Sequence, residues 1–148
     1  MAFNVLIVDD SAVMRAMVAR VLRLSGLPLG EVYEAGDGAQ GLAAVRAHWV
    51  DLVLLDVNMP VMDGEEMLRR LRAEPETAAL PVIVVSTEGS EARRAALEAL
   101  GVWFIRKPFK PEELRALILR ATGVTPDDEY YAHVPAGAPA ELDGALDF

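Results

Sequence analysis

The stretch "LLDVNMPVMDG" (54–64) decides the fold, because a buried segment ends inside it at a charged residue. The apolar run before Asp56 is short and unbroken, so it predicts a strand that is covered on both faces. Pro60 and Gly64 follow and restrict the loop toward the next helix. An aspartate that ends a buried strand and precedes a stiff loop indicates a functional site at this end of the strand.

The other strands and helices are predicted from the spacing of apolar residues. Strands are expected at "NVLIV" (4–8), "EVYEA" (31–35), "DLVLL" (51–55), "PVIVV" (81–85) and "VWFI" (102–105). Between them, helical spacing is carried by Val13, Met14, Met17, Val18, Val21 and Leu22, then by Met67, Leu68 and Leu71, and then by the segments "SEARRAALEAL" and "PEELRALILRATG". Two capping boxes, "DGAQ" (37–40) and "DGEE" (63–66), predict two of the helix starts.

This alternation of strands and helices predicts the fold class. We expect an α/β protein with a doubly wound, five-stranded parallel sheet of the flavodoxin type, (βα)5, with helices on both faces and strand order 2-1-3-4-5. In that order strands one and three are neighbours, and their carboxyl ends flank the topological switch point. A ligand site is expected there.

Composition excludes several classes of protein. The chain has 148 residues and no cysteine, which excludes disulfide bonds and thiolate metal sites. Its net charge of −9 argues against autonomous nucleic-acid binding, which needs a basic face. No apolar stretch approaches the roughly 18 residues of a membrane span, and the N-terminus lacks the features of a signal peptide. We therefore expect a cytoplasmic protein without membrane insertion.

The acidic charge is concentrated near the C-terminus. Residues 1–123 contain 17 acidic and 14 basic residues, whereas residues 124–148 contain six acidic residues and no Lys or Arg. The second range also contains Pro, Ala and Gly in a pattern typical of a flexible tail. We predict one domain over 1–123 and an acidic tail over 124–148. Because the tail is too short to bury a core, we expect output through contact with another protein.

Three carboxylates are predicted to meet at one edge of the sheet. Asp9 and Asp10 end the first strand, and Asp56 ends the third. Each like-charge pair costs about 4 kcal/mol at ~4 Å and an effective dielectric constant near 20, so the cluster needs compensation. Carboxylate oxygens suit Mg²⁺ or Mn²⁺, which bind few carboxylates together with phosphate. The three residues therefore predict a partial metal site that a phosphoryl group completes.

Two further residues fall at the same edge. Lys107 ends the fifth strand in "FIRKPF", and Ser86 ends the fourth in "VVSTEG". A nucleophilic carboxylate, a metal, a cation and a hydroxyl donor are the parts needed to form and hold an aspartyl phosphate. Taken singly, such residues are more often turn, cap or surface residues. Their coincidence at the carboxyl ends of strands favours function.

Four motifs carry a resemblance to a known family. They are "VDDS" (8–11), "LLDVNMPVMDG" (54–64), "VSTE" (85–88) and "RKPF" (106–109). With them, residues 4–122 resemble the receiver domain of two-component response regulators, most of all the stand-alone, CheY-like chemotaxis type. The resemblance implies that Asp56 accepts a phosphoryl group from a sensor histidine kinase and that Lys107 holds the phosphoryl oxygens. It also implies that Asp10, helped by Asp9, binds Mg²⁺ with Asp56 and the backbone carbonyl of Asn58.

The resemblance also implies how the signal leaves the site. Ser86 would move toward the phosphoryl group and Phe104 would turn inward, which changes a face built from strands four and five that binds a protein target. Phe104 lacks the hydroxyl of the Tyr common in the chemotaxis type, so contacts through that hydroxyl are in doubt; ordinary core packing is the alternative for this ring. Asn58 and Glu88 resemble a fast-decaying pattern of phosphate hydrolysis, whereas Thr87 would slow access to the site.

The end of the tail allows a separate hypothesis. In "PAELDGALDF" (139–148), Leu142, Leu146 and Phe148 could line one side of a short helix that docks on the output face of its own chain. The alternative is a disordered, solubilising tail, because isolated helices of this length are marginal in water.

These observations lead to one functional prediction and two alternatives. We predict a monomeric, single-domain response regulator, a phosphorylation-activated switch with slow self-dephosphorylation rather than an enzyme. The first alternative is a phosphorelay intermediate that passes its phosphoryl group to a histidine phosphotransfer protein. The second is a Mg²⁺-dependent phosphatase with an Asp nucleophile. That class usually has a second aspartate where this chain has Asn58. The kinase, the target and the pathway are not set by the sequence.

Overall fold

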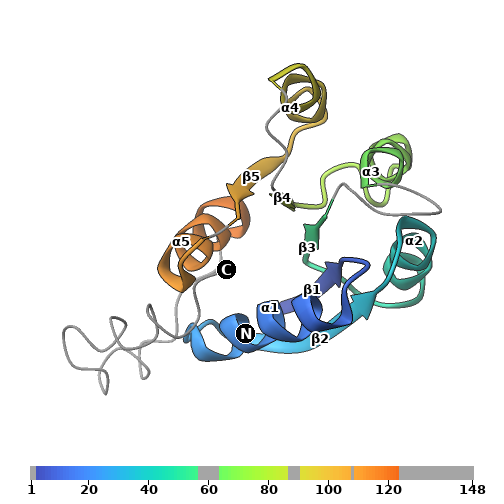
Figure 1. Ribbon diagram of the computed structural model, residues 1–148. Coiled ribbons are helices and arrows are strands. Elements are labelled where there is room, and N and C mark those ends of the chain that lie inside the picture. The colour runs from blue at the N-terminus through green and yellow to red at the C-terminus, as the bar shows by residue number, and fades with distance from the viewer. Residues whose placement is uncertain (1–2, 57–63, 87–90, 108, 124–148) are drawn as a thin grey trace.

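The computed structural model describes residues 3–56, 64–86, 91–107 and 109–123. Strands and helices alternate along these ranges (Figure 1). In chain order they are β1 (Phe3–Val8), α1 (Ala12–Leu24), β2 (Leu29–Ala35), α2 (Gly38–Ala47), β3 (Leu52–Leu55), α3 (Gly64–Ala73), β4 (Val82–Ser86), α4 (Glu91–Glu98), β5 (Trp103–Arg106) and α5 (Pro111–Thr122).

The strands form one parallel sheet in the order β2-β1-β3-β4-β5. The predicted doubly wound fold and its 2-1-3-4-5 order are therefore confirmed. β1 pairs with both β2 and β3, and Val8 has Ala35 on one side and Leu55 on the other. The last residues of these three strands therefore lie next to one another, at the edge where the sequence predicts a site.

Both faces of the sheet are covered by helices. Side chains of one face join α1 and α5 in one apolar cluster, and those of the other face join α2, α3 and α4 in a second. Along β1, Val5 and Ile7 belong to the first cluster, and Leu6 and Val8 to the second. A central strand that is buried on both faces must be apolar at successive positions, which accounts for the unbroken runs of β1 and β3.

Strand boundaries depart from the sequence prediction by one or two residues. β2 begins at Leu29, two residues before the predicted start at Glu31, because Leu29 pairs with Phe3 across an irregularity in the register. β2 is an edge strand whose residues before Ala35 are half-buried or exposed, so its apolar signal is weak. β4 and β5 each extend one residue further than predicted, to Ser86 and Arg106, which pair with each other.

Several helix ends use side-chain or glycine caps. Ser11 caps α1, and its Oγ accepts from the backbone N–H of Met14. Asp37 caps α2 as predicted, but the reciprocal bond of Gln40 goes to the N–H of Gly36, one residue before the cap, so the capping box is incomplete. The second predicted box begins at Asp63, outside the described residues. α5 ends as predicted at Gly123, which has a left-handed backbone with φ of 69°.

Within the described ranges, no helix has both the length and the apolar character needed to cross a bilayer.

Candidate functional site

Three carboxylates converge at the carboxyl edge of the sheet. Backbone hydrogen bonds extend the sheet past the strand ends, because Asp9 N–H donates to Ala35 O at 3.1 Å and Asp56 N–H donates to Val8 O at 2.9 Å. One carboxylate oxygen each of Asp9, Asp10 and Asp56 lies within 4.8 Å of the others. Asp9 is buried, Asp56 is half-buried and Asp10 is exposed. The structure thus brings together the three acids that the sequence placed at this edge.

The carboxylate of Asp9 has two neighbours that fix its orientation. Its Oδ1 accepts the backbone N–H of Ser11 at 2.9 Å, and its Oδ2 lies 3.5 Å from Lys107 Nζ. The side chains of Asp9 and Lys107 are only 9% and 15% exposed, so this ion pair is screened less by water than a surface pair would be. Lys107 directly follows β5 and reaches across the edge of the sheet to the end of β1.

The chemistry of these donors fits a hard divalent cation. Carboxylate oxygens are the ligands that Mg²⁺ and Mn²⁺ prefer over softer metals. The three carboxylates gather acidic charge at one edge of the sheet, beside the ammonium of Lys107. A divalent cation would balance this charge.

Other predicted site residues are only partly described. The backbone of Ser86 ends β4 at the same edge, in register with Arg106, and the role of its hydroxyl stays a prediction. Asn58, Thr87 and Glu88 lie outside the described residues, as do the tail residues Leu142, Leu146 and Phe148.

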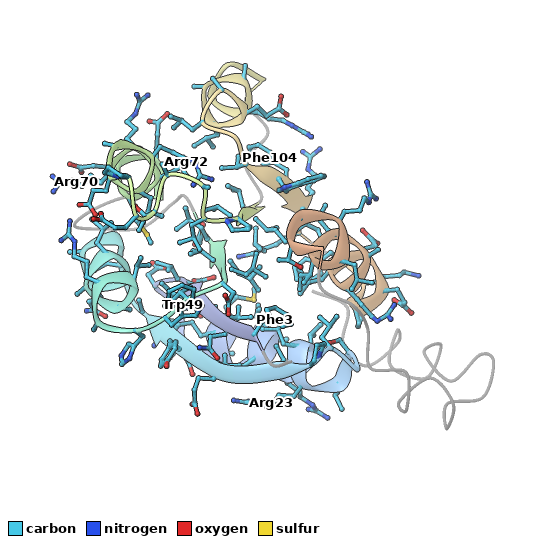
Figure 2. The ribbon with its side chains drawn as sticks, turned by 180° about the vertical axis from the view of Figure 1, so that it is seen from behind. Phe3, Arg23, Trp49, Arg70, Arg72 and Phe104 are labelled. Atoms are coloured by element: carbon cyan, nitrogen blue, oxygen red, sulfur yellow. The ribbon has the colours of Figure 1, made fainter. Side chains whose placement is uncertain are left out.

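Phe104 lies where β5 meets α4. Its side chain is partly buried against the cluster of α2, α3 and α4 (Figure 2). The guanidinium carbon of Arg94, on α4, lies 5.0 Å from the centre of the ring, and Arg94 Nε donates to Glu98 Oε1 at 2.9 Å. The ring therefore packs against this cluster and also lies close to the cation of Arg94. Sequence reasoning identified Phe104 but not Arg94.

Sequence reasoning also missed Arg15. This residue of α1 donates from Nη1 to the backbone carbonyl of Asp9 at 2.6 Å and from Nε to Glu34 Oε1 at 3.0 Å. The signal was weak, because α1 contains two further arginines, Arg20 and Arg23, and Arg15 differs from them only in lying one turn into the helix. Helical periodicity gives the side of the helix on which Arg15 lies, but not that its side chain turns back toward the strand end.

The fold and the site together define a class of protein. A parallel sheet of order 2-1-3-4-5 with three carboxylates and a lysine at its switch point defines an α/β protein with an acidic ligand-binding edge. The sequence model of the response regulator receiver domain matches residues 5–119. The chain belongs to this family, and the predicted receiver domain is confirmed.

Curated relatives share the receiver region and are longer than this chain. The cyclic di-GMP phosphodiesterase response regulator RpfG of Xanthomonas campestris is 43% identical over 117 residues, which are 78% of this chain and 31% of that protein. The probable transcriptional regulatory protein TcrX of Mycobacterium tuberculosis is 43% identical over 130 residues, with 84% and 53% covered. The chain thus spans about one third to one half of the length of these two relatives.

Solved structures of similar length share the fold. The chemotaxis response regulator CheY4 of Vibrio cholerae is 34% identical, has a TM-score of 0.73, and matches 82% of this chain and 99% of its own. A CheY of Borrelia burgdorferi, solved in complex with CheX, BeF3 and Mg²⁺, is 27% identical with a TM-score of 0.72, covering 80% and 87%.

Proposed function

We propose that this receiver is a phosphorylation-activated switch in which Asp56 accepts the phosphoryl group. The observation that carries the proposal is the convergence of Asp9, Asp10 and Asp56 within 4.8 Å, with Lys107 3.5 Å from Asp9. Asp9 is already engaged by Ser11 and Lys107, and Asp10 precedes the helix at an exposed position. Asp56 directly follows the central strand β3 and is half-buried, which suits a nucleophile that must be both oriented and accessible.

The transfer takes a phosphoryl group from a phosphohistidine of a sensor histidine kinase. An Asp56 carboxylate oxygen forms the new O–P bond while the N–P bond of the donor breaks, and the imidazole leaves with the electron pair and takes up a proton. Lys107 places a positive charge where the phosphoryl oxygens gain negative charge. A Mg²⁺ or Mn²⁺ ion held by Asp9, Asp10, Asp56 and the carbonyl of Asn58 would neutralise further charge on these oxygens.

The response would follow from the new charge on Asp56. A phosphoryl group adds about −1.5 to −2 charges, and Ser86 would donate its hydroxyl to it. Phe104 would then turn inward, and the face of β4 and β5 would change its affinity for a protein target. Asn58, Thr87 and Glu88 would set the rate of slow self-dephosphorylation.

Chemotaxis-type signalling in the cytoplasm is the pathway that we propose. It is supported by the likeness to CheY4 of Vibrio cholerae, which this chain covers over 99% of its length. In this proposal residues 1–123 are the receiver and act as a monomer. Residues 124–148 are an acidic tail, with Leu142, Leu146 and Phe148 as the residues that would dock if it binds its own receiver.

Phosphorylation by a small phosphodonor tests the proposal. The full chain is incubated with phosphoramidate and Mg²⁺, and intact-mass spectrometry should show one added phosphoryl group per chain. Asp56→Asn should show none, because the amide is not a comparable nucleophile. Asp51→Asn is the control, since Asp51 precedes the same strand at its opposite end, and it should be phosphorylated like the unaltered chain. Phosphorylation of Asp56→Asn, or sustained hydrolysis of many donors per second, would contradict the proposal.

A further inference from the structure

Arg15 joins three elements next to the acidic site. Its guanidinium bonds the backbone carbonyl of Asp9 at 2.6 Å and the carboxylate of Glu34 at 3.0 Å. Asp9 follows β1, Glu34 is on β2, and Arg15 itself is on α1. The Arg15 side chain is 19% exposed, so it is largely enclosed between these elements.

The turn that carries Asp10 is closed by four hydrogen bonds. Ser11 N–H donates to Asp9 Oδ1 at 2.9 Å, and Met14 N–H donates to Ser11 Oγ at 3.2 Å. Arg15 N–H donates to Ser11 O at 3.0 Å, and Arg15 Nη1 donates to Asp9 O. The first three bonds fix the start of the helix. Two of these bonds, from Ser11 N–H to the Asp9 carboxylate and from Arg15 Nη1 to the Asp9 backbone carbonyl, tie this start back to the end of β1 across Asp10, and the Arg15 bond is the one that fixes the backbone there.

We propose that Arg15 is a positioning residue that holds Asp9 and Asp10 in the geometry needed to bind a divalent cation. The inference rests on the proposed function, because it assigns that site its cation. Arg15 contacts neither the cation nor the phosphoryl group in this role. It acts through the Asp9 carbonyl, and Glu34 orients its guanidinium.

The planar guanidinium is required because it makes two bonds at once. Arginine presents several N–H donors in a fixed fork, whereas lysine has one flexible ammonium. The pair with Glu34 restricts the rotamer of Arg15, so that Nη1 stays directed at the Asp9 carbonyl. Groups that orient metal ligands in this way commonly change metal affinity when they are replaced.

If Arg15 acted only through its charge, its replacement would change the cation affinity in the opposite direction. The positive charge of Arg15 repels a cation at the acidic site, so its removal would strengthen cation binding if charge alone mattered. If Arg15 positions the acids, its removal weakens binding in spite of the lost repulsion. The charge-retaining change Arg15→Lys and the neutral change Arg15→Gln therefore separate the two roles.

Mn²⁺ binding without a phosphodonor is the direct test. The full chain is titrated with Mn²⁺, and the free ion is followed by electron paramagnetic resonance. We expect Arg15→Lys and Arg15→Gln to weaken binding roughly tenfold, the lower end of the range for such orienting groups. Arg46→Lys is the matched control, because Arg46 forms a 2.6 Å ion pair with Glu74 between α2 and the end of α3, away from the site, and should bind Mn²⁺ as before.

A second variant and a metal-free measurement guard against misfolding. Glu34 is 45% exposed, so Glu34→Ala should fold, and it removes only the group that orients Arg15. It should weaken Mn²⁺ binding in the same direction by a smaller factor. In the metal-free protein, both Arg15 variants should shift the Ser11 amide resonance in NMR spectra, whereas Arg46→Lys should leave it unchanged.

The outcomes are distinct from those of the phosphorylation experiment. Unchanged Mn²⁺ affinity in Arg15→Lys, tighter binding in Arg15→Gln, or no Mn²⁺ binding by the unaltered chain would overturn the role of Arg15. The proposed function would survive the first two results if phosphoramidate still modifies Asp56. Conversely, if Mn²⁺ binding depends on Arg15 but Asp56 is not phosphorylated, the proposed function fails and the role of Arg15 stands.

Discussion

Asp10 is the acid of the cluster with the fewest constraints from its surroundings. It is exposed, whereas Asp9 is buried and bonded to Ser11, and Asp56 is half-buried at the end of β3. All three lie within 4.8 Å of one another, so in the metal-free protein their mutual repulsion opposes folding. In the proposed function, Asp10 would therefore hold the cation at a cost in stability.

Removal of the Asp10 charge should stabilise the metal-free protein. Asp10→Asn keeps the size of the side chain and relieves repulsion with two carboxylates. We expect the free energy of unfolding to rise by about 1 kcal/mol, a value that allows for solvent screening of an exposed group. Urea unfolding with a chelator present measures this change.

The gain should disappear when a divalent cation is added. In the proposed function, saturating Mg²⁺ should stabilise the unaltered chain by binding its folded state, and Asp10→Asn would lack one of the proposed ligands. Glu76→Gln, which removes an exposed acid near the start of β4, is the control and should change stability little in either condition. Destabilisation of Asp10→Asn in the chelator would mean that repulsion in the cluster is already compensated.

At this scale the sequence predicts the acids of the site but not the groups that orient them. Asp9, Asp10 and Asp56 could be assigned because apolar runs mark strand ends and the parallel topology brings those ends together. Arg15 could not, because its bond to the Asp9 carbonyl depends on side-chain torsions and on the approach of Glu34 from β2. Such contacts are absent from any periodic pattern.

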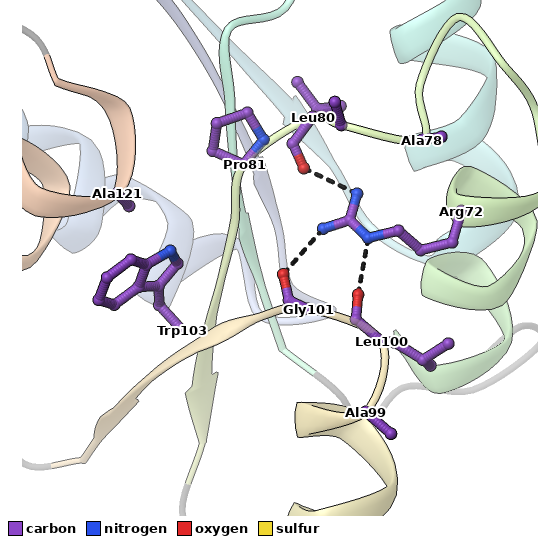
Figure 3. Close-up of a pocket in the computed structure, with 10 residues that line it drawn as sticks. Arg72, Ala78, Leu80, Pro81, Ala99, Leu100, Gly101, Trp103 and Ala121 are labelled. Carbon is purple, nitrogen blue, oxygen red and sulfur yellow. Dashed lines mark hydrogen bonds between the residues drawn. The ribbon is translucent and has the colours of Figure 1, made fainter.

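Between elements, Arg72 connects the end of α3 to the segments that precede β4 and β5. Its guanidinium donates to the carbonyls of Leu100 at 2.7 Å, Leu80 at 2.8 Å and Gly101 at 3.2 Å (Figure 3). A longer bond of 3.4 Å reaches the carbonyl of Thr77. Burial lowers the pKa of Arg72 from its ordinary value, because the cation loses hydration. Carbonyl dipoles replace that hydration. In return, the bonds from Arg72 to Leu100 and Gly101 hold the turn that follows α4.

Arg72→Ala should be strongly destabilising. It leaves several carbonyls without their charged donor, and we expect a loss of about 2–4 kcal/mol in the free energy of unfolding. Arg70→Ala is the control on the same helix. Arg70 lies on the outer side of α3 (Figure 2) and pairs with Glu66 at 3.0 Å, so its removal should cost about 0.5 kcal/mol or less. Equal losses in the two variants would show that the carbonyl contacts of Arg72 add nothing.

Arg94 should affect Phe104 more than it affects global stability. Arg94→Gln removes the cation that lies 5.0 Å from the ring centre, and the expected loss of stability is about 0.5–1 kcal/mol. The NMR resonances of the Phe104 ring should shift. Arg69→Gln is the control, since it breaks a comparable pair with Glu65 on α3 and should leave these resonances in place. Unshifted Phe104 resonances in Arg94→Gln would contradict the contact.

At the element scale, the strands and helices were predictable and their boundaries less so. Unbroken apolar runs marked β1 and β3 because both faces are buried. The start of β2 was missed because Gly30 and Glu31 are exposed on an edge strand, where pairing with β1 rather than burial decides the boundary. Gln40 was expected to bond the Asp37 N–H, and its longer reach to Gly36 could not be read from residue types.

For the whole molecule, the distribution of charge divides the chain near residue 123. The buried core of the described residues runs from Phe3 to Ile118, and α5 closes at Gly123. Six acidic residues and no Lys or Arg follow in residues 124–148. We infer that residues 1–123 fold on their own and that the tail acts mainly through its charge.

A chain that ends at Gly123 tests this division by thermal unfolding. We expect an unchanged, cooperative transition, because we infer that the tail adds no packing to residues 1–123. The measurement is sensitive enough to test this, since a loss of 1 kcal/mol would lower Tm by roughly 4 °C for a domain of this size. A clear decrease in Tm would show that the tail packs on the receiver.

The tail should also affect cation binding in a salt-dependent way. Its negative charges attract Mn²⁺ to the whole molecule when the Debye length is about 30 Å, at 0.01 M salt, but hardly at 0.15 M, where it is about 8 Å. The chain that ends at Gly123 should therefore bind Mn²⁺ more weakly than the full chain at low salt and equally well at 0.15 M. Long-range attraction by the charges of residues 124–148 is screened at 0.15 M and cannot produce a difference that persists there. Such a difference would instead place the tail in contact with the receiver, as docking through Leu142, Leu146 and Phe148 would require.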